Sequence, residues 1–346
     1  MAISPAENDE KSGVAVGDGL FLFDVAESWP TLPAGGNFVE VAAVATDSAD
    51  RVYVFNRGER PLMVFSPTGE FISSWGEDVF LHAHGITIGP DDAVYCVDDS
   101  DHTVKKFSLD GQLLLTLGKS GKYSATGATT IDYRTIAHSG PPFNYPTSLA
   151  LGDAGEMYVT DGYGNARVHK FSADGELMLS WGEPGGGPGQ FHVPHGIAID
   201  SQGLLYIADR ENSRIQRFTS GGVYVDEWSD VARPCEVFID AADAVYVAEL
   251  GYRAGMWPGT SAPSPDATGG RVSIFNIQGE RLASWGGGEN PCAAGDFFAP
   301  HDIWVDQRGD VYVSEVTMSA GGNRGLVSPE CHCLQKFIRK SKAIHP

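Results

Sequence analysis

The chain has 346 residues, 42% of them hydrophobic, and its formal net charge at pH 7 is −21. Nucleic acids and anionic membrane surfaces attract clustered Lys and Arg, so this charge argues against both as partners. No run of 18 apolar residues predicts a membrane span, and the N-terminal stretch has no apolar core of the kind found in secretory signals. We therefore expect a globular, cytoplasmic protein.

The chain is expected to begin with a flexible segment, residues 1–18, and to end in a short tail, residues 341–346. The stretch between them, residues 19–340, is predicted to be one domain built from repeats. Its first apolar phrase, GLFLFDVAESWP at 19–30, precedes the first repeat and has no other partner. We expect this phrase to supply a missing strand to the last repeat.

Six repeats follow along the chain. Each opens with a short apolar phrase, continues with a strand that has a central tyrosine, and most close with a Gly turn and a phrase such as SWG. The tyrosines are Tyr53, Tyr95, Tyr158, Tyr206, Tyr246 and Tyr312. Each repeat offers about four short alternating strands, the pattern of one propeller blade. The sequence therefore predicts an all-β, six-bladed β-propeller whose ring is closed by the N-terminal strand in the last blade, which removes the free sheet edges.

Three of the ten histidines stand at the entrance of the first strand of a repeat: His84 in HAHG, His195 in VPHG and His301 in APHD. They belong to repeats two, four and six, and the first strand of a blade lies beside the central axis. The three imidazoles should therefore converge at one end of the axis. Three nitrogen ligands and an open position are what a catalytic zinc site needs. A role as turn residues would explain one such histidine, but it does not explain three at alternate blades.

The turn after the second strand faces the same end of the ring, since the first two strands run antiparallel. This turn holds Arg57 in FNRGE, Tyr163 in TDGYG and Arg210 in ADREN. Guanidinium groups suit a carboxylate through paired hydrogen bonds. A tyrosine near a dication and two cations should have a lowered pKa, which would suit it as a general base.

Four insertions fall in connections that share this face, at residues 119–145, 251–270, 287–298 and 316–330. Long loops gathered on one face commonly form a lid or a specificity wall. Within them, Tyr252, Arg253 and Trp257 are candidates for contact with a substrate.

Several phrases resemble those of known proteins. The D-x-x-N-x-R phrasing is similar to NHL repeats, and four longer phrases resemble those of the peptidyl-α-hydroxyglycine α-amidating lyases. These phrases are TDGYGNAR (160–167), GQFHVPH (189–195), ADRENSRIQ (208–216) and APHD (299–302). That family is a six-bladed propeller that cleaves a C-terminal α-hydroxyglycine to an amide and glyoxylate.

The resemblance implies a role for each candidate residue. Zinc would be held by His84, His195 and His301, and Tyr163 would be the base. Arg57 and Arg210 would bind the substrate carboxylate and stabilise transition-state charge.

The resemblance also implies a structural calcium ion in the channel, held by the backbone carbonyls of Val44 and Ile86 and by the carboxylate of Asp302. An acid beside the axis is itself a reason to expect a cation. An unpaired buried carboxylate is costly, and calcium prefers oxygen ligands.

The chain also departs from the family. Ala299 and Gly164 stand where the family has Met and Cys, and the family's disulfide pairs have no counterparts in this chain. Five cysteines, an odd number, predict no disulfide framework, in keeping with a reducing compartment. The C-x-C pair Cys331 and Cys333 is cramped for two ligands of one tetrahedral ion. Cys235, at the axial slot of repeat five, is expected to have a packing role.

The sequence thus favours a zinc-dependent lyase that breaks a C–N bond at a hydroxylated carbon of a small molecule or a peptide C-terminus. One alternative keeps the metal but makes the protein a hydrolase of a lactone, ester or amide. The other is a non-catalytic NHL-type platform that binds proteins. The oligomeric state is left open.

Overall fold

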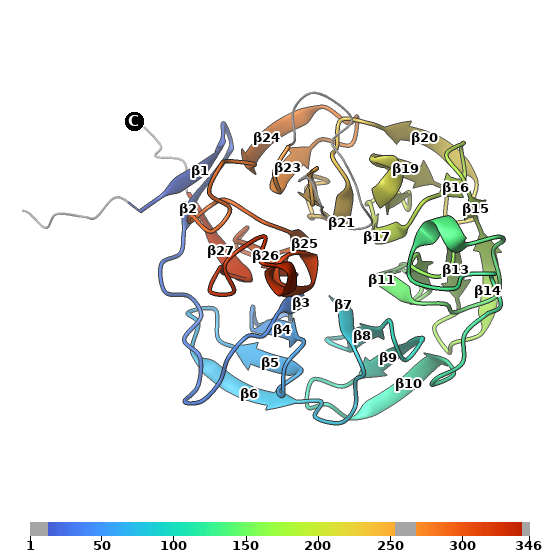
Figure 1. The fold of residues 1–346 in the computed structure, drawn as a ribbon, viewed down its shortest axis with the longest axis horizontal. Helices are drawn as coiled ribbons and strands as arrows, with labels where there is room; N and C mark the ends of the chain where they lie inside the picture. Colours follow the sequence, from blue (N-terminus) through green and yellow to red (C-terminus); the bar gives the residue numbers. More distant parts are fainter. Residues whose placement is uncertain (1–12, 253–267, 341–346) are drawn as a thin grey trace, which may run out of the picture.

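The computed structural model describes residues 13–252 and 268–340, which form six antiparallel sheets arranged as a ring around a central axis (Figure 1). The first strand of each repeat lies beside the axis, and the later strands lie progressively toward the rim. The prediction of an all-β, six-bladed propeller is confirmed.

The first five blades have four strands each, which follow one another in chain order from the axis to the rim. Blade one is β3 (Val41–Thr46), β4 (Val52–Asn56), β5 (Leu62–Phe65) and β6 (Phe71–Trp75); blade two is β7 (Ala83–Ile88), β8 (Val94–Asp98), β9 (Thr103–Phe107) and β10 (Leu113–Gly118). Blade three is β11 (Pro146–Leu151), β12 (Met157–Asp161), β13 (Arg167–Phe171) and β14 (Leu177–Trp181); blade four is β17 (Pro194–Ile199), β18 (Leu205–Asp209), β19 (Arg214–Phe218) and β20 (Tyr224–Trp228). Blade five is β21 (Pro234–Ile239), β22 (Val245–Glu249), β23 (Arg271–Phe275) and β24 (Arg281–Gly286).

The sixth blade combines strands from both ends of the chain. β25 (Pro300–Val305), β26 (Val311–Glu315) and β27 (Leu334–Arg339) come from the last repeat, and β2 (Phe21–Val25) pairs antiparallel with β27. β1 (Ala15–Asp18) pairs with β2 as a fifth strand. The N-terminal hairpin therefore covers the edge that β27 would otherwise expose. Ala15–Asp18, which belong to the N-terminal segment expected to be flexible, form β1.

Small elements lie in the connections. β15 (Glu183–Pro184) pairs with β16 (Gln190–Phe191) between blades three and four. The helical turns are η1 (Tyr133–Thr135), η2 (Arg210–Asn212), α1 (Thr317–Ala320) and η3 (Gly322–Arg324). Among the described residues, no helix has the length and apolar character needed to cross a bilayer.

The residues that define the repeat also join neighbouring blades. The outer-strand tryptophan of one blade packs against the third-strand phenylalanine of the next, as Trp75 does against Phe107 with ring centroids 5.1 Å apart. The central tyrosine of four repeats donates to an aspartate six residues earlier, as Tyr206 does to Asp200 at 3.1 Å. Six clusters of buried apolar side chains each join two adjacent blades, and one of them joins blade six to blade one. Burial between blades, rather than within one blade, holds the ring closed.

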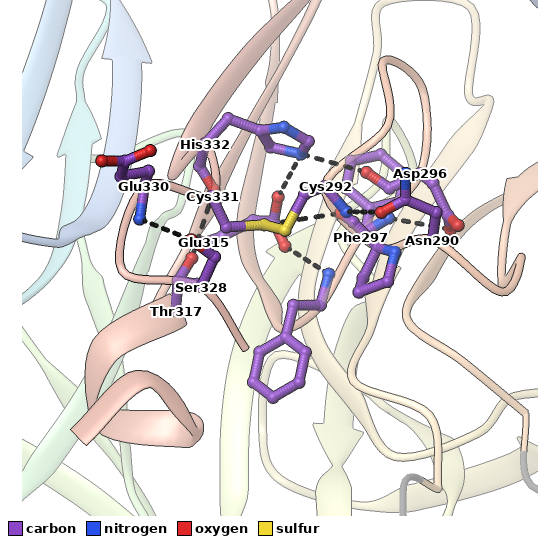
Figure 2. Close-up of a disulfide and its surroundings, with 12 residues drawn as sticks. Asn290, Cys292, Asp296, Phe297, Glu315, Thr317, Ser328, Glu330, Cys331 and His332 are labelled. Carbon is purple, nitrogen blue, oxygen red and sulfur yellow. Dashed lines mark hydrogen bonds and ion pairs between the residues drawn. A yellow bond between two sulfur atoms is a disulfide. The ribbon is translucent and has the colours of Figure 1, made fainter. Parts of the chain in front are cut away.

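A disulfide joins Cys292, in the insertion 287–298, to Cys331, which directly follows the insertion 316–330 (Figure 2). Their Cα atoms are 5.0 Å apart, and the bond ties the connection before β25 to the connection between β26 and β27. The neighbouring His332 places Nε2 3.0 Å from a carboxylate oxygen of Glu315 and 3.1 Å from the carbonyl oxygen of Asp296.

The expectation that the cysteines form no disulfide was therefore wrong for this pair. The two residues are separated by 39 positions and meet only because two long loops of blade six fold against each other. Disulfides persist mainly in oxidising compartments. The cysteine argument for a reducing compartment thus loses its basis, and a cytoplasmic location stays a prediction.

Candidate metal centre

The three predicted histidines meet on the axis. His84, His195 and His301 are each the second residue of an inner strand, in β7, β17 and β25, and each is at most 4% exposed. Every pair of imidazole rings has its centroids 4.8 Å apart. One ligand atom from each histidine lies within 4.8 Å of the others, so the three are close enough to hold one metal ion.

Hydrogen bonds to backbone carbonyls set the orientation of each imidazole. Nδ1 of His84 donates to the carbonyl of Thr147 (2.7 Å), Nδ1 of His195 to that of Cys235 (2.9 Å) and Nδ1 of His301 to that of Ala42 (2.7 Å). A carbonyl can only accept, so Nδ1 must carry the proton and Nε2 is left with its lone pair. Each acceptor is the second residue of the inner strand in the next blade. This arrangement of ligand and supporting carbonyl is typical of metal-binding histidines.

The protonation states also suit a metal. Burial lowers the pKa of all three imidazoles, that of His301 to about 3, and the nearby guanidinium groups add to the effect. The neighbouring imidazoles also lower the pKa of His84 and His195. Neutral imidazole is the form that binds a metal. The residues present therefore fit a metal ion with three nitrogen ligands.

Tyr163 lies directly over this cluster. Its hydroxyl is 3.0 Å from Nε2 of His195 and 3.2 Å from Nε2 of His84, and Nη1 of Arg210 donates to it at 3.2 Å. Burial raises the pKa of the phenol, and the charge of Arg210 opposes that shift. The expected lowering of this pKa is therefore not achieved by the protein alone and would need the charge of a bound metal.

Arg57 and Arg210 approach the same space from blades one and four. Nη1 of Arg57 is 2.5 Å from Oε1 of Glu40, and its Nε donates to the carbonyl of Ala83 at 2.9 Å. Its Nη2 makes no hydrogen bond within the described residues, so it is available to a ligand. Nε of Arg210 is 2.9 Å from Oε1 of Glu211. Nη1, at the other end of the same guanidinium, donates to the Tyr163 hydroxyl.

A cavity of about 240 Å³ opens above the histidines. Its polar lining includes Arg57, Tyr163 and Arg210, and its apolar lining is formed by Ile131, Leu250, Val316 and Ala320. Ile131 belongs to the predicted insertion 119–145, and Val316 and Ala320 belong to the insertion 316–330. Two of the four insertions thus line the cavity as expected, and the disulfide ties a third, 287–298, to Cys331, which directly follows the insertion 316–330.

Other predicted contacts fall elsewhere. The hydroxyl of Tyr252 bonds to that of Ser213 rather than lining the cavity. Arg253 and Trp257 lie outside the described residues. Cys235 packs against Leu250 and other apolar side chains, and its Sγ also lies 3.6 Å from Nδ1 of His195. Burial raises the pKa of its thiol to about 12.

Sequence reasoning missed Arg233, which lines the cavity and is 2% exposed. The signal was present, because Arg233 stands immediately before β21, as Tyr145 stands before β11 and His82 before β7, and those two also line the cavity. Three of the six positions that directly precede an inner strand therefore contribute to the cavity lining.

A second polar site lies deeper in the channel, where Asp302 and Glu236 face a separate cavity that Ile86 also lines. Both carboxyls are buried; burial raises the pKa of Asp302 to about 8, and burial together with the charge of Asp302 raises that of Glu236 well above its usual value. The amide of Val44 donates to Asp302 at 3.0 Å. Glu236 was not predicted, although it is the third residue of β21 as Asp302 is the third residue of β25.

A glycine makes room for the Glu236 carboxylate. A Cβ added at Gly196 would lie 2.4 Å from Oε1 of Glu236. The glycine in the phrase VPHG is therefore required by the close approach of the neighbouring blade, and not only by a turn.

The fold and site define a six-bladed NHL-repeat propeller with three histidines on its axis. The NHL repeat family matches residues 143–171 and 191–218. The chain is 31% identical to human "NHL repeat-containing protein 3" over 318 residues, which cover 86% of this chain and 82% of that protein. It is 28% identical over 315 residues to "Peptidyl-alpha-hydroxyglycine alpha-amidating lyase 1" of Drosophila melanogaster, covering 80% of this chain and 55% of that protein.

The chain therefore belongs to the family of NHL-repeat propellers that includes NHL repeat-containing protein 3 and the peptidyl-α-hydroxyglycine α-amidating lyases. It spans only 61% of the length of mouse NHL repeat-containing protein 3, which it matches at 33% identity, and about half of the fly lyase. Among solved structures, a gluconolactonase from Xanthomonas campestris matches with a TM-score of 0.59 at 13% identity, covering 96% of this chain and 99% of that one. That likeness concerns the fold.

Proposed function

We propose that this protein is a zinc-dependent lyase that cleaves the C–N bond of a carbinolamine such as a C-terminal α-hydroxyglycine. The observation that carries the proposal is the meeting of three kinds of group in one cavity. Three imidazole Nε2 atoms surround one point, the Tyr163 hydroxyl lies within 3.2 Å of two of them, and Arg57 and Arg210 flank the same space. Relatives named as lyases of this class support the choice of reaction.

The chemistry follows from the position of each group. Zinc held by His84, His195 and His301 would supply Lewis acidity that lowers the pKa of the substrate hydroxyl. Tyr163 removes the hydroxyl proton while the C–N bond breaks and the carbonyl of glyoxylate forms. The leaving amide nitrogen gains one proton, so the reaction is proton-neutral overall and consumes no water.

Arg57 and Arg210 are assigned to the substrate carboxylate. The free Nη2 of Arg57 and the buried guanidinium of Arg210 face the cavity from two blades. Hydrogen bonds from both arginines would hold the substrate carboxylate between them and place the α-carbon near Tyr163. The energy of binding the carboxylate would thus orient the reacting hydroxyl toward the base. The substrate is a small molecule or the C-terminus of a peptide, and the apolar lining residues of the cavity would accept its acyl part.

The zinc-loaded protein is expected to convert N-benzoyl-α-hydroxyglycine to benzamide and glyoxylate in equal amounts. Mass spectrometry in ¹⁸O-labelled water provides the measurement, and the benzoyl product is the one to read, because glyoxylate exchanges its aldehyde oxygen with water by hydration. A lyase releases benzamide without solvent oxygen, whereas formation of ¹⁸O-labelled benzoate would establish a hydrolase. Absence of turnover with the metal bound would favour a non-catalytic platform.

The deeper channel site is assigned to a structural calcium ion held by Asp302, with Glu236 as a further carboxylate and the carbonyls of Val44 and Ile86 completing the set. Two buried carboxyls close to each other repel when ionised, and a dication removes that repulsion. Calcium is therefore expected to stabilise the protein by about 2.7 kcal/mol at a concentration 100 times its Kd. The thermal unfolding midpoint, measured with EGTA and then with millimolar calcium, checks this.

Asp302→Asn should abolish the calcium-dependent shift of the unfolding midpoint, and magnesium should not replace calcium in the wild type. An identical midpoint with EGTA and with calcium in the wild-type protein would contradict the assignment.

A further inference from the structure

Arg233 occupies a position that directs its side chain to the cavity. Its backbone is left-handed (φ 52°), as are those of Tyr145 (φ 60°) and Val193 (φ 61°), and each of the three precedes a proline that opens an inner strand. Non-glycine residues adopt this conformation only at a cost, so the surrounding structure must hold it. The conformation is thus a property of the propeller, and blade five uses it to bring a guanidinium into the cavity wall.

Arg233 does not act on its own. Its Nη2 and Nε lie 2.7 Å and 3.1 Å from the two carboxylate oxygens of Glu211. The oxygen of Glu211 that accepts from Nη2 of Arg233 also accepts from Nε of Arg210 at 2.9 Å. Arg210 in turn donates to the Tyr163 hydroxyl. A continuous path of part-buried hydrogen bonds therefore runs from Arg233 through Glu211 and Arg210 to Tyr163.

We propose that Arg233, acting through Glu211, is a positioning residue that fixes the guanidinium of Arg210 against Tyr163. That the position of the Arg210 guanidinium matters for the reaction rests on the proposed function. Bidentate hydrogen bonding by the Arg233 guanidinium fixes the orientation of the Glu211 carboxylate. A fixed acceptor in turn holds Nε of Arg210 in one place. Without Arg233, Glu211 could rotate and Arg210 could follow it away from Tyr163.

Arg214 lies in the same blade as Arg210 and has a structural role. It is buried, it binds Asp209 and Glu227, and it donates to the carbonyls of Gly186, Gly187 and Gln190. It does not line the cavity. Removal of its partner Glu227, whose carboxylate is 2.9 Å from Nη1 of Arg214, is therefore a matched control for the loss of one ion pair.

The experiment compares Arg233→Met, Arg233→Lys and Glu211→Gln with the control Glu227→Gln in the zinc-loaded, full-length protein. The first readout is the NMR cross-peak of the Arg210 Nε–Hε group, assigned by its loss in Arg210→Lys. The second is the Kd for N-benzoylglycine, which lacks the reactive hydroxyl, measured by calorimetry. The third is the division of any activity loss between kcat and KM with N-benzoyl-α-hydroxyglycine. Circular dichroism verifies that each variant is folded.

Arg233→Met and Glu211→Gln are expected to shift or broaden the Arg210 cross-peak and to weaken N-benzoylglycine binding about tenfold, the effect of losing one hydrogen bond to a charged group. Arg233→Lys, which keeps the charge but not the two-pronged geometry, should recover part of the affinity. Glu227→Gln should leave the cross-peak and Kd as in the wild type. If Arg233→Met does not fold, the conservative Arg233→Lys and Glu211→Gln variants decide.

An Arg210 cross-peak that is unchanged in the folded Arg233 and Glu211 variants would overturn the proposal, whatever the activity. A wild-type protein that releases no glyoxylate but shows the expected cross-peak changes would refute the proposed lyase reaction alone.

Discussion

The wild-type protein is expected to bind about one zinc ion per chain, and the His195→Ala variant is expected to bind almost none. The imidazole of His195 is one of only three nitrogen donors that the described residues bring to the centre, and its ring centroid lies 4.8 Å from each of the other two. Two remaining nitrogens leave the ion with too few protein ligands for a tetrahedral site. Elemental mass spectrometry of protein purified after zinc-replete expression measures the content.

His192→Ala serves as the matched control, because His192 precedes the same strand but lies outside the cluster. It should retain its zinc. No transition metal in the wild-type protein, or full zinc in His195→Ala, would leave the three histidines without a metal-binding role. The non-catalytic platform would then be the better hypothesis.

Tyr163→Phe is expected to keep its zinc but to lower kcat for glyoxylate release by roughly 10²- to 10⁴-fold, the range typical for loss of a general base. The hydroxyl is the atom of Tyr163 that approaches the histidine nitrogens, at 3.0 Å and 3.2 Å, whereas its ring packs edge-on against His84 and His195. Phenylalanine preserves the ring contacts and removes only the hydroxyl. Steady-state kinetics combined with zinc analysis measures both effects.

The control for this variant is Tyr158→Phe, which removes a hydroxyl from a buried tyrosine of β12 in the same blade, away from the cavity. Its turnover should remain close to that of the wild type. Near-normal turnover of Tyr163→Phe would remove Tyr163 as the base while leaving the metal assignment intact.

Much of the fold could be predicted because the repeat carries its own contacts. The tryptophan of SWG and the phenylalanine of the third strand recur in register, and in the ring they meet across blade boundaries, as Trp75 and Phe107 do. Each blade needs only its neighbours to bury these rings, so a periodic sequence determines a periodic structure. The strand at Ala15–Asp18 was missed because it belongs to no repeat and is paired only by β2 among the described strands.

Residues of the candidate site could be predicted where the same residue type recurs at the same position of several inner strands. His84, His195 and His301 stand at one slot of alternate blades, and that spacing alone placed them together. Glu236 shares its position, third in the inner strand, with Asp302, and Arg233 is the only arginine directly before an inner strand. Neither residue type recurs through the blades with a regular period, so the ring arrangement is what shows that both side chains face the channel.

The sequence by itself determined the six blades, the axial position of the histidines and the face on which the insertions gather, because each of these depends on the order and period of residues within a repeat. Only the tertiary structure decided the direction of each imidazole lone pair, the contact of the Tyr163 hydroxyl with two histidines and the Cys292–Cys331 disulfide. These depend on atoms brought together from different blades or from long loops. Their distances are set when the ring closes and its loops pack, and no local period in the chain encodes them.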